Sequence, residues 1–433
     1  MGIRYLNRFI QQRCPETPTR IHLRDLSGKR IAVDTSIYMY RYSGEGALLE
    51  NMYLMASVFR HYNIHAVFIF DGPPPPQKTD LIELRRKKKE IAKKQYDVLA
   101  TIIKEKKRAG YASVETTELD DIEDSMRELK KQFVRLRDCD IANVKELLVS
   151  FGFATIDAEG EADVLCAKLS LKKRVDACLS DDTDMFVYGC PVVLRHISLL
   201  NHSVVSYDTR EILKKLSLTQ QEFKMMCVVC GTDYSPTISS SAGGAAAAST
   251  VSPEFVFKKI TKFKLLPSAE IQKYHNSGGG FYDWYSEEGT ATATAGKKNT
   301  GTSAITYISN ESMFDITSPT GATVDSKYKQ LVILNRADIH NQRIVEIMMK
   351  EDFIFIEPSP SDQSVIQSLS SGNGSLSSSS VYGIAGSSSE DSLETQATLL
   401  ANDVYGVMAS SFQELHRFHN KRHGSSSRSR HDN

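Results

Sequence analysis

Short apolar runs alternate with amphipathic stretches through the first half of the chain. The runs at Ile31–Asp34, Ala66–Asp71, Val175–Ser180, Val192–His196 and Ser203–Tyr207 predict strands. Helical patterns such as Ile141–Phe151 lie between them. Buried strands separated by helices are typical of an α/β fold with a mostly parallel central sheet flanked by helices. We therefore predict an α/β core over residues 1–234.

Residues 80–138 depart from this pattern because they are charged, helix-prone and nearly free of Gly and Pro. We expect long helices that project from the sheet rather than cover it. Residues 78–108 carry twelve Lys and Arg against five Asp and Glu, a net charge of +7. Such a projection would attract the phosphates of a single-stranded nucleic acid.

The composition changes after residue 234. Residues 235–357 form a predicted C-terminal part with low-complexity insertions, in which Phe255–Lys264 reads as a basic helix and Leu331–Leu334 and Phe353–Ile356 read as strands. Residues 358–433 are Ser-rich with a basic end, and we expect them to be disordered.

Composition indicates where the protein is found in the cell, but not which reaction it catalyses. The 53 Lys and Arg balance the 53 Asp and Glu, so net charge indicates no partner. Seven dispersed cysteines favour reduced thiols, and Cys227 and Cys230 lie in a pattern typical of a buried helix rather than a zinc site. Neither a secretory signal nor a run of ~20 apolar residues is visible, so we expect an intracellular protein outside the membrane.

Carboxylates follow several of the predicted strands. Asp34, Asp71 and the pair Asp182 and Asp184 come at strand ends, where ligand sites gather in open α/β sheets. If that pair is extended, both side chains face one site and Asp181 points away. Three more acids stand at predicted helix ends: Glu161, Asp163 and Asp233.

Each acid taken singly is better explained as a helix cap or a partner of a lysine. As a set, so many carboxylates can share one site only if cations neutralise them. Oxygen ligands favour Mg²⁺ or Mn²⁺. Two such ions ~4 Å apart can activate a water and stabilise a phosphate under attack.

Ordered sequence blocks connect these acids. The blocks are Met1–Ile3, Ile31–Ser36, Phe68–Pro74, Asp157–Ala167, Ser180–Met185 and Cys230–Tyr234. In this order they resemble the flap endonuclease or XPG-type 5′ nuclease family. The resemblance implies a PIN-like 5′ nuclease fold with a helical arch at about 78–138.

The resemblance also implies the site. It assigns seven metal-binding carboxylates: Asp34, Asp71, Glu161, Asp163, Asp182, Asp184 and Asp233. Asp163 stands where the family usually has Glu, which we expect to modulate activity rather than remove it. The implied cofactor is a pair of Mg²⁺ ions, for which Mn²⁺ can substitute.

A gateway helix of the family supplies a Lys and an Arg, and Lys78 and Arg85 match them by position. Their spacing of seven places both on one helix face, where they can grip the scissile phosphate. The further nucleic-acid contacts that we predict are Gly2, Tyr40, Arg86 and Lys87. For Arg86 and Lys87 the alternative is an ordinary solvated helix face, and for Tyr40 it is core packing.

Three familiar features are not recognisable. Residues 235–245 lack the Gly-x-Gly hairpin of the family's helix–two-turn–helix, so that element is degenerate here and strict flap specificity is in question. Gln413–Phe418 lacks the paired aromatics of a sliding-clamp peptide, and Gly289–Lys297 does not have the spacing of an ATP-binding loop. We expect a monomer.

The resulting prediction is a metal-dependent, structure-selective 5′ nuclease, flap endonuclease-like with 5′-3′ exonuclease activity, in DNA replication or repair. Its substrates would carry a 5′ flap, a branch or a single-stranded 5′ end. The alternatives are an RNA-directed nuclease of the same fold and a catalytically inactive scaffold. The low-complexity insertions favour a divergent lineage, either protist or viral. For a cellular protein we expect a nuclear location. For a viral protein we expect the viral factory or the host cytoplasm or nucleus.

Overall fold

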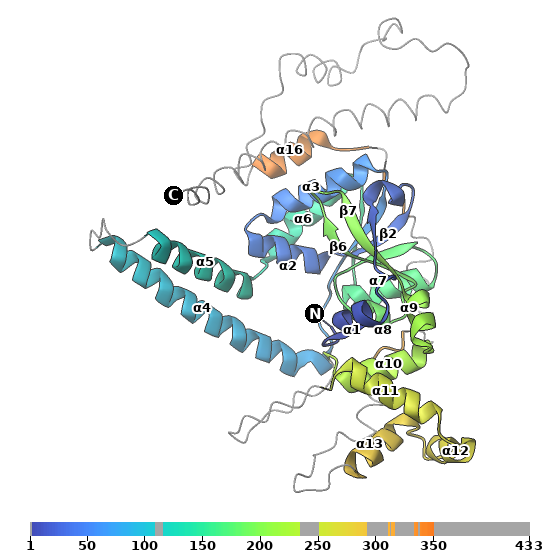
Figure 1. Ribbon diagram of the computed structural model, residues 1–433. Helices are drawn as coiled ribbons and strands as arrows, with labels where there is room; N and C mark the ends of the chain where they lie inside the picture. The colour runs from blue at the N-terminus through green and yellow to red at the C-terminus, as the bar shows by residue number, and fades with distance from the viewer. Residues whose placement is uncertain are drawn as a thin grey trace, which may run out of the picture.

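The computed structural model shows an α/β core from which a helical arm projects (Figure 1). It describes residues 2–108, 116–233, 251–291, 311, 313–316, 333–336 and 338–349. Everything stated below concerns those residues.

One seven-stranded sheet organises the core. Its strands are β1 (Thr19–His22), β2 (Arg30–Asp34), β3 (His65–Phe70), β4 (Ala154–Asp157), β5 (Ala177–Leu179), β6 (Val192–Ser198) and β7 (Ser203–Asp208). Their order is β1-β7-β6-β5-β2-β3-β4. The strands from β6 to β4 in this order are mutually parallel, and β7 and β1 pair antiparallel at one edge.

Helices join the strands. The first group is α1 (Leu6–Arg13), α2 (Thr35–Glu45), α3 (Leu48–His61), α4 (Thr79–Arg108), α5 (Thr116–Gln132), α6 (Asp138–Ser150), α7 (Ala162–Leu171) and α8 (Asp184–Val187). The second group is α9 (Thr209–Leu216), α10 (Gln220–Cys230), α11 (Pro253–Lys264), α12 (Ser268–Asn276), α13 (Phe281–Ala291) and α16 (Asn341–Met349). Two 3₁₀ turns, η1 (Leu23–Leu26) and η2 (Pro76–Lys78), complete the list.

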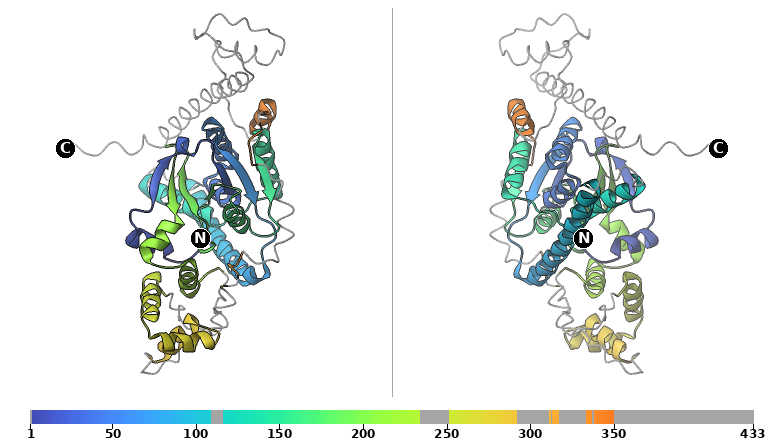
Figure 2. Two further views of the ribbon diagram at one scale, coloured as in Figure 1. Left: turned by 90° about the vertical axis from the view of Figure 1, so that its right-hand side faces the viewer. Right: turned by 90° about the vertical axis from the view of Figure 1, so that its left-hand side faces the viewer.

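The sheet separates two apolar clusters. Figures 1 and 2 show helices on both of its faces. One cluster lies beneath α1, α7, α8, α9, α10 and α11, and the other lies beneath α2, α3, α6 and α16. In β2 and β3 nearly every side chain is buried, because each of the two faces is covered by helices. The predicted α/β fold with a mostly parallel sheet is confirmed.

The order of the central strands creates a place for a ligand. Strand β2 lies between β3 and β5, and the chain builds the sheet outward from β2 in both directions. The crossover connections therefore leave β2 toward opposite sides, which opens a crevice at the carboxyl ends of these strands. Asp34 is the last residue of β2, at that crevice.

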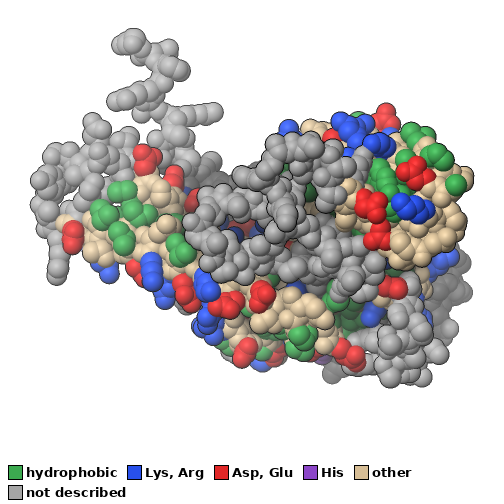
Figure 3. Space-filling view, turned by 90° about the horizontal axis from the view of Figure 1, so that it is seen from below, with side chains coloured by type: hydrophobic (Ala, Val, Ile, Leu, Met, Phe, Trp, Pro, Cys, Tyr) green, Lys and Arg blue, Asp and Glu red, His purple; other side chains and the backbone are tan. Residues whose placement is uncertain are grey.

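The predicted projecting helices are α4 and α5, which pack on each other and extend from the core (Figure 1). Tyr96 and Phe133 contact edge to face with ring centroids 5.4 Å apart, which fastens α4 near the end of α5. Seen from below, basic and acidic side chains are interspersed along this arm (Figure 3).

The sequence patterns missed two strands, β1 and β4. Both are four-residue strands at the edges of the sheet, and neither contains a fully buried residue. A short, half-exposed strand has no apolar run to reveal it. The strand predicted at Leu331–Leu334 is also wrong for its described part, because Ile333 and Leu334 belong to no strand.

The C-terminal part contributes to the core. The helix predicted at Phe255–Lys264 is confirmed as part of α11. Ile344, Ile347 and Met348 of α16 join the cluster beneath α6, and Arg343 pairs with Glu146 of α6. The boundaries predicted at 234 and 357, the strand predicted at Phe353–Ile356, Gln413–Phe418 and the tail 358–433 lie outside the described residues.

Within the described helices, none is both long and apolar enough to cross a membrane. Cys227 and Cys230 are buried on α10, as their surroundings predicted.

Candidate metal centre

Two carboxylates, Asp34 and Asp184, are buried close to the carboxyl ends of the central strands, and we call them the floor acids. The residue Asp34 is only 4% exposed, and one of its oxygens accepts a hydrogen bond of 2.9 Å from Ser180 Oγ. Asp184 is 2% exposed. Among the described residues, its Oδ1 is buried without a hydrogen-bond partner. A buried oxygen in that state costs free energy unless something else compensates it.

Asp182 and Asp184 lie together, but not for the reason that their spacing suggested. Strand β5 ends at Leu179, and Asp184 is the first residue of the short helix α8. A turn, rather than an extended segment, brings them together, and Asp182 Oδ1 accepts a 3.1 Å hydrogen bond from the amide of Asp184. The expectation that Asp181 points elsewhere is confirmed, because its carboxylate contacts Arg41 and the amide of His196.

Three further acids come from the end of β3 and the start of α7. Asp71 directly follows β3 and accepts a 2.8 Å hydrogen bond from the amide of Ala162 at the start of α7. Glu161 occupies the N-cap position of α7, and Asp163 lies in its first turn. These placements agree with the predicted helix start.

Two acids at the edge of the crevice already have basic partners, and we call Glu161 and Asp233 the rim acids. Lys78 Nζ lies 2.6 Å from Glu161 Oε1, and Arg85 Nη2 lies 2.6 Å from Asp233 Oδ2. Lys78 ends η2 and Arg85 lies nearly two turns into α4, so the two do not share one helix as predicted. The base of the arm nevertheless faces the acids. Lys78 is mostly buried, and burial by itself lowers its pKa. The hydrogen bond and the charge of Glu161 outweigh this effect, so the pKa of Lys78 is raised overall.

The charges of the seven predicted acids act on one another. Burial raises the pKa of Asp34 well above its usual range, and the charges of Asp163 and Asp71 add to this effect. Burial also raises the pKa of Asp184 strongly, with added repulsion from Asp182, Asp163 and Asp233.

For Asp163, burial and the charge of Glu161 raise the pKa to about 7. Two unit charges 4 Å apart repel by ~4 kcal/mol at an effective dielectric constant of about 20. The structure thus gathers acids that resist ionising together.

This donor set fits a hard divalent cation. All seven groups offer carboxylate oxygens, which Mg²⁺ and Mn²⁺ prefer. Asp184 Oδ1 is buried and has no hydrogen-bond partner among the described residues, which is the setting expected of a metal ligand. In the described part of the chain, no three His, Cys, Asp or Glu side chains are arranged ready to hold an ion. The carboxylates would therefore have to draw together around a bound cation.

The other residues predicted to contact nucleic acid differ in their exposure and in their partners. Tyr40 is 45% exposed on α2, and Lys89 Nζ lies 5.2 Å from its ring centroid. Tyr40 is therefore not a core residue, whereas Tyr38 is fully buried. Arg86 and Lys87 are exposed and pair with acids one turn away on α4, as on an ordinary solvated helix face.

Gly2 lies against the acid loop. Its φ is +79°, and a Cβ there would stand 2.2 Å from Asp182 Oδ1 and 2.6 Å from Asp184 Oδ1. Only glycine fits this position without displacing the acids. The amide of Ile3 also donates a 2.8 Å hydrogen bond to Thr183 Oγ1, which fastens the N-terminal segment to the same loop.

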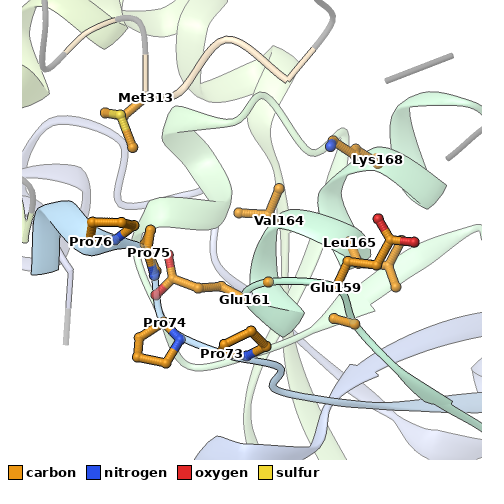
Figure 4. A pocket seen from close by; sticks show the side chains of 12 residues that line it. Pro73, Pro74, Pro75, Pro76, Glu159, Glu161, Val164, Leu165, Lys168 and Met313 are labelled. Atoms are coloured by element: carbon orange, nitrogen blue, oxygen red, sulfur yellow. The ribbon is translucent and has the colours of Figure 1, made fainter. Parts of the chain in front are cut away.

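Beside the rim lies a cavity of about 490 Å³, lined on one side by Pro73–Pro76 and on the other by Val164, Leu165 and Lys168 (Figure 4). Glu161 also lines it, and its side chain extends toward the prolines. The proline run follows Gly72, whose amide donates a 2.7 Å hydrogen bond to Gly160 O just before α7.

Sequence reasoning missed Ser180. Its Oγ donates to Asp34 and accepts a 3.2 Å hydrogen bond from the amide of Asp182, so it joins two of the acids directly. A small polar residue at the end of an apolar strand is the signal that could have indicated it.

The geometry defines an acid-rich centre at the switch point of an α/β sheet, with basic residues at its edge. The XPG N-terminal domain matches residues 1–92, and the XPG I-region matches residues 152–233. Five of the seven acids fall in the second region and two in the first. Over these two regions the chain is similar to the XPG-type 5′ nucleases.

Named relatives are similar at a lower level. A probable RAD2-like endonuclease of Invertebrate iridescent virus 6 is 27% identical over 290 residues, covering 55% of this chain and 68% of the relative. Flap endonuclease 1 of Theileria parva is 26% identical over 305 residues, covering 66% of this chain and 55% of the relative. The match thus spans only part of each relative's length.

A solved catalytic core of Rad2 in complex with DNA substrate aligns with 81% of this chain and 95% of its own, at 19% identity and a TM-score of 0.46. That similarity is too low to carry a functional conclusion.

Proposed function

We propose that this protein is a metal-dependent 5′ nuclease that hydrolyses DNA phosphodiester bonds at flaps, branches or single-stranded 5′ ends. The observation that carries the proposal is the pair of buried floor acids, Asp34 at the end of β2 and Asp184 at the start of α8. Asp184 has an oxygen with no hydrogen-bond partner in the described structure. Two divalent cations, Mg²⁺ or Mn²⁺, would be held by the seven acids listed above.

Bound cations would supply an activated water and neutralise charge on the phosphate. The chain's own residues do the rest. Asp34, Asp182 and Asp184 would hold cations at the floor, and Ser180 orients Asp34 through its 2.9 Å hydrogen bond. The half-buried Asp163 has a shorter side chain than the usual Glu, which favours contact through a water.

Lys78 and Arg85 would bind the scissile phosphate. Both point into the crevice, where they now pair with the rim acids. A phosphate entering the site competes for these cationic groups, and they would stabilise its added negative charge during attack. Tyr40, which is exposed beside Lys89, would stack on an unpaired base of the substrate.

The direct test is cleavage of end-labelled DNA with Mg²⁺ and with EDTA. The substrates are a 5′ flap, a single strand, a nicked duplex and a blunt duplex. The variant is Asp184→Ala, and the matched control is Asp157→Ala. Asp157 also ends a strand of the sheet, but its side chain is 67% exposed and pairs with Lys145.

We expect Mg²⁺-dependent release of the flap, lost in Asp184→Ala and kept in Asp157→Ala. Cleavage of single strands alone would move the substrate away from flaps. Absence of DNA cleavage by the wild type with either metal, together with cleavage of matched RNA substrates, would favour the RNA-directed enzyme. Inactivity on both DNA and RNA would favour a catalytically inactive scaffold.

A further inference from the structure

Asp181 lies next to the metal-site loop but faces away from the crevice. Its side chain is 12% exposed and pairs with Arg41 of α2. The amide of His196 in β6 donates a 2.7 Å hydrogen bond to Asp181 Oδ1. One carboxylate thus connects the loop that bears Asp182 and Asp184 to two other elements.

Strand β6 departs from regular geometry to make this contact. The β6–β7 register shifts between Arg195 and Ser198, and His196 has a φ of +54°. A left-handed residue other than glycine costs ~1 kcal/mol or more. Bulges of this kind re-aim groups toward a site. Here the bulge turns the amide of His196 toward Asp181.

Arg195 holds the same loop by its backbone. It is only 4% exposed, and its guanidinium lies 5.8 Å and 5.7 Å from the ring centroids of Phe186 and Tyr207. From this buried position Nη2 donates a 2.7 Å hydrogen bond to Asp181 O, and Nη1 donates a 2.9 Å bond to Asn7 Oδ1. Both the side chain and the carbonyl of Asp181 are therefore fixed.

We propose that Asp181 is a positioning residue that sets how the two floor acids converge on a cation. Helix α2 begins directly after Asp34, and Arg41 lies two turns along it. The Arg41–Asp181 pair therefore ties the helix that follows one floor acid to the loop that carries the other. This inference rests on the proposed function, because only a shared cation requires the two carboxylates to keep a fixed separation.

The effect on metal binding follows from the rigidity of such sites. A ligand displaced by about 0.5 Å no longer meets ideal Mg²⁺ geometry. Loss of an outer partner of a metal ligand typically costs about 10- to 100-fold in metal affinity or activity. We expect Asp181→Asn to fall in that range.

A second ion pair provides a matched control. Asp176, at the opposite end of the same strands, accepts bonds from the Arg30 amide at 2.8 Å and from the Arg30 guanidinium at 3.0 Å. It has the same chemistry as Asp181, one arginine and one backbone amide on a carboxylate, and it lies away from the crevice. Asp176→Asn should lower Tm without changing metal affinity.

If the Arg41–Asp181 pair acted on the site only through its charges, substitutions of its two members would change cation binding in opposite directions. Removing a negative charge near the site weakens cation binding, and removing a positive charge strengthens it. Arg41→Gln removes a positive charge, yet if the pair positions the acids, it too must weaken binding. The two substitutions therefore have the same sign under positioning and opposite signs under simple electrostatics.

The test measures Mn²⁺ affinity by titration calorimetry and by the Mn²⁺ electron paramagnetic resonance signal in the full chain. Wild type, Asp181→Asn, Arg41→Gln and Asp176→Asn are compared, together with Tm and with kcat and KM on a flap substrate. We expect about 10- to 100-fold weaker Mn²⁺ binding for Asp181→Asn and Arg41→Gln, with kcat reduced more than KM is raised. Asp176→Asn should bind Mn²⁺ like the wild type.

Tighter Mn²⁺ binding by Arg41→Gln, wild-type binding by Asp181→Asn, or an equal loss in Asp176→Asn would overturn the positioning role. Those results leave the proposed nuclease standing if the wild type binds Mn²⁺ and cleaves. Failure of the wild type to bind Mn²⁺ would instead remove both proposals.

Discussion

The floor acids and the rim acids are the same chemical group in opposite surroundings. Asp34 at the end of β2 and Asp184 at the start of α8 are buried, and neither has a basic partner among the ion pairs of the described residues. Glu161 and Asp233 pair with Lys78 and Arg85. The rim therefore carries its own counter-charge from η2 and α4, whereas the floor depends on a cation from solution. The difference separates acids that need a cation from acids that already have a basic partner, which they can exchange when metal and substrate enter.

The largest expected effect comes from the floor. Asp184→Asn removes a ligand but also a buried charge whose oxygen has no partner in the described structure. Cleavage should fall at least ~10³-fold, equivalent to about 4 kcal/mol of transition-state stabilisation. Without divalent metal, Tm should rise by a few °C, because a buried unpaired carboxylate is costly. Cleavage rates and calorimetric melting check both parts, and a lower Tm would show that the floor charge is already compensated.

At the rim, Lys78→Ala should separate catalysis from metal binding. Loss of the lysine should lower kcat by ~10²- to 10³-fold, because one cationic group no longer stabilises the attacked phosphate. Metal affinity should rise, because Glu161 is released from its 2.6 Å ion pair.

The control for this variant is Lys87→Ala. Lys87 pairs with Glu83 on the exposed face of α4, so neither quantity should change by more than about twofold. Weaker Mn²⁺ binding in Lys78→Ala would contradict the division between rim and floor.

Fold and site were predictable from the sequence to different degrees. Strands β2 and β3 are apolar runs buried on both faces, so their position and the acids after them could be read directly. The closeness of Asp182 and Asp184 was predicted on a wrong geometry, since a turn brings them together.

The Lys78–Glu161 and Arg85–Asp233 pairs were not predictable. Helical spacing gives the face on which a residue lies, but not what stands across from it. Ser180 and the Arg41–Asp181 pair were missed for the same reason, because each joins segments about 140 residues or more apart.

Substitutions of Tyr40 test whether an unpaired base stacks on its ring. Tyr40→Ala should weaken binding of single-stranded 5′ ends about 10-fold, because base stacking on an aromatic ring contributes ~1–3 kcal/mol. Tyr40→Phe keeps the ring and should bind like the wild type. Fluorescence anisotropy with Ca²⁺ in place of Mg²⁺ measures binding without turnover. Equal loss in both variants would assign the effect to the hydroxyl and remove the stacking role.

A smaller effect concerns the dependence of stability on pH without metal. The pKa of Asp163 is about 7 in the folded protein and about 3.9 in an unfolded chain. Between these values the native state binds a proton that the unfolded state has lost, so stability decreases as pH rises from about 4 to 7. Asp34 and Asp184, whose pKa values are also raised, act in the same direction.

Melting without metal should therefore show Tm falling by a few °C from pH 5 to 8, and Asp163→Asn should flatten part of that slope. Saturating Mg²⁺ should flatten it further, because bound cations favour the ionised acids. A Tm that rises with pH over this range would mean that the acids are neutralised within the protein.

The central claim is that the floor acids hold divalent cations, and the most direct measurement is a crystal structure with Mn²⁺ and anomalous diffraction. The account predicts anomalous peaks within coordination distance of Asp34 and of Asp184, with Lys78 and Arg85 outside the coordination shell. A structure in which Mn²⁺ is absent from the floor, or contacts the rim acids alone, would contradict it.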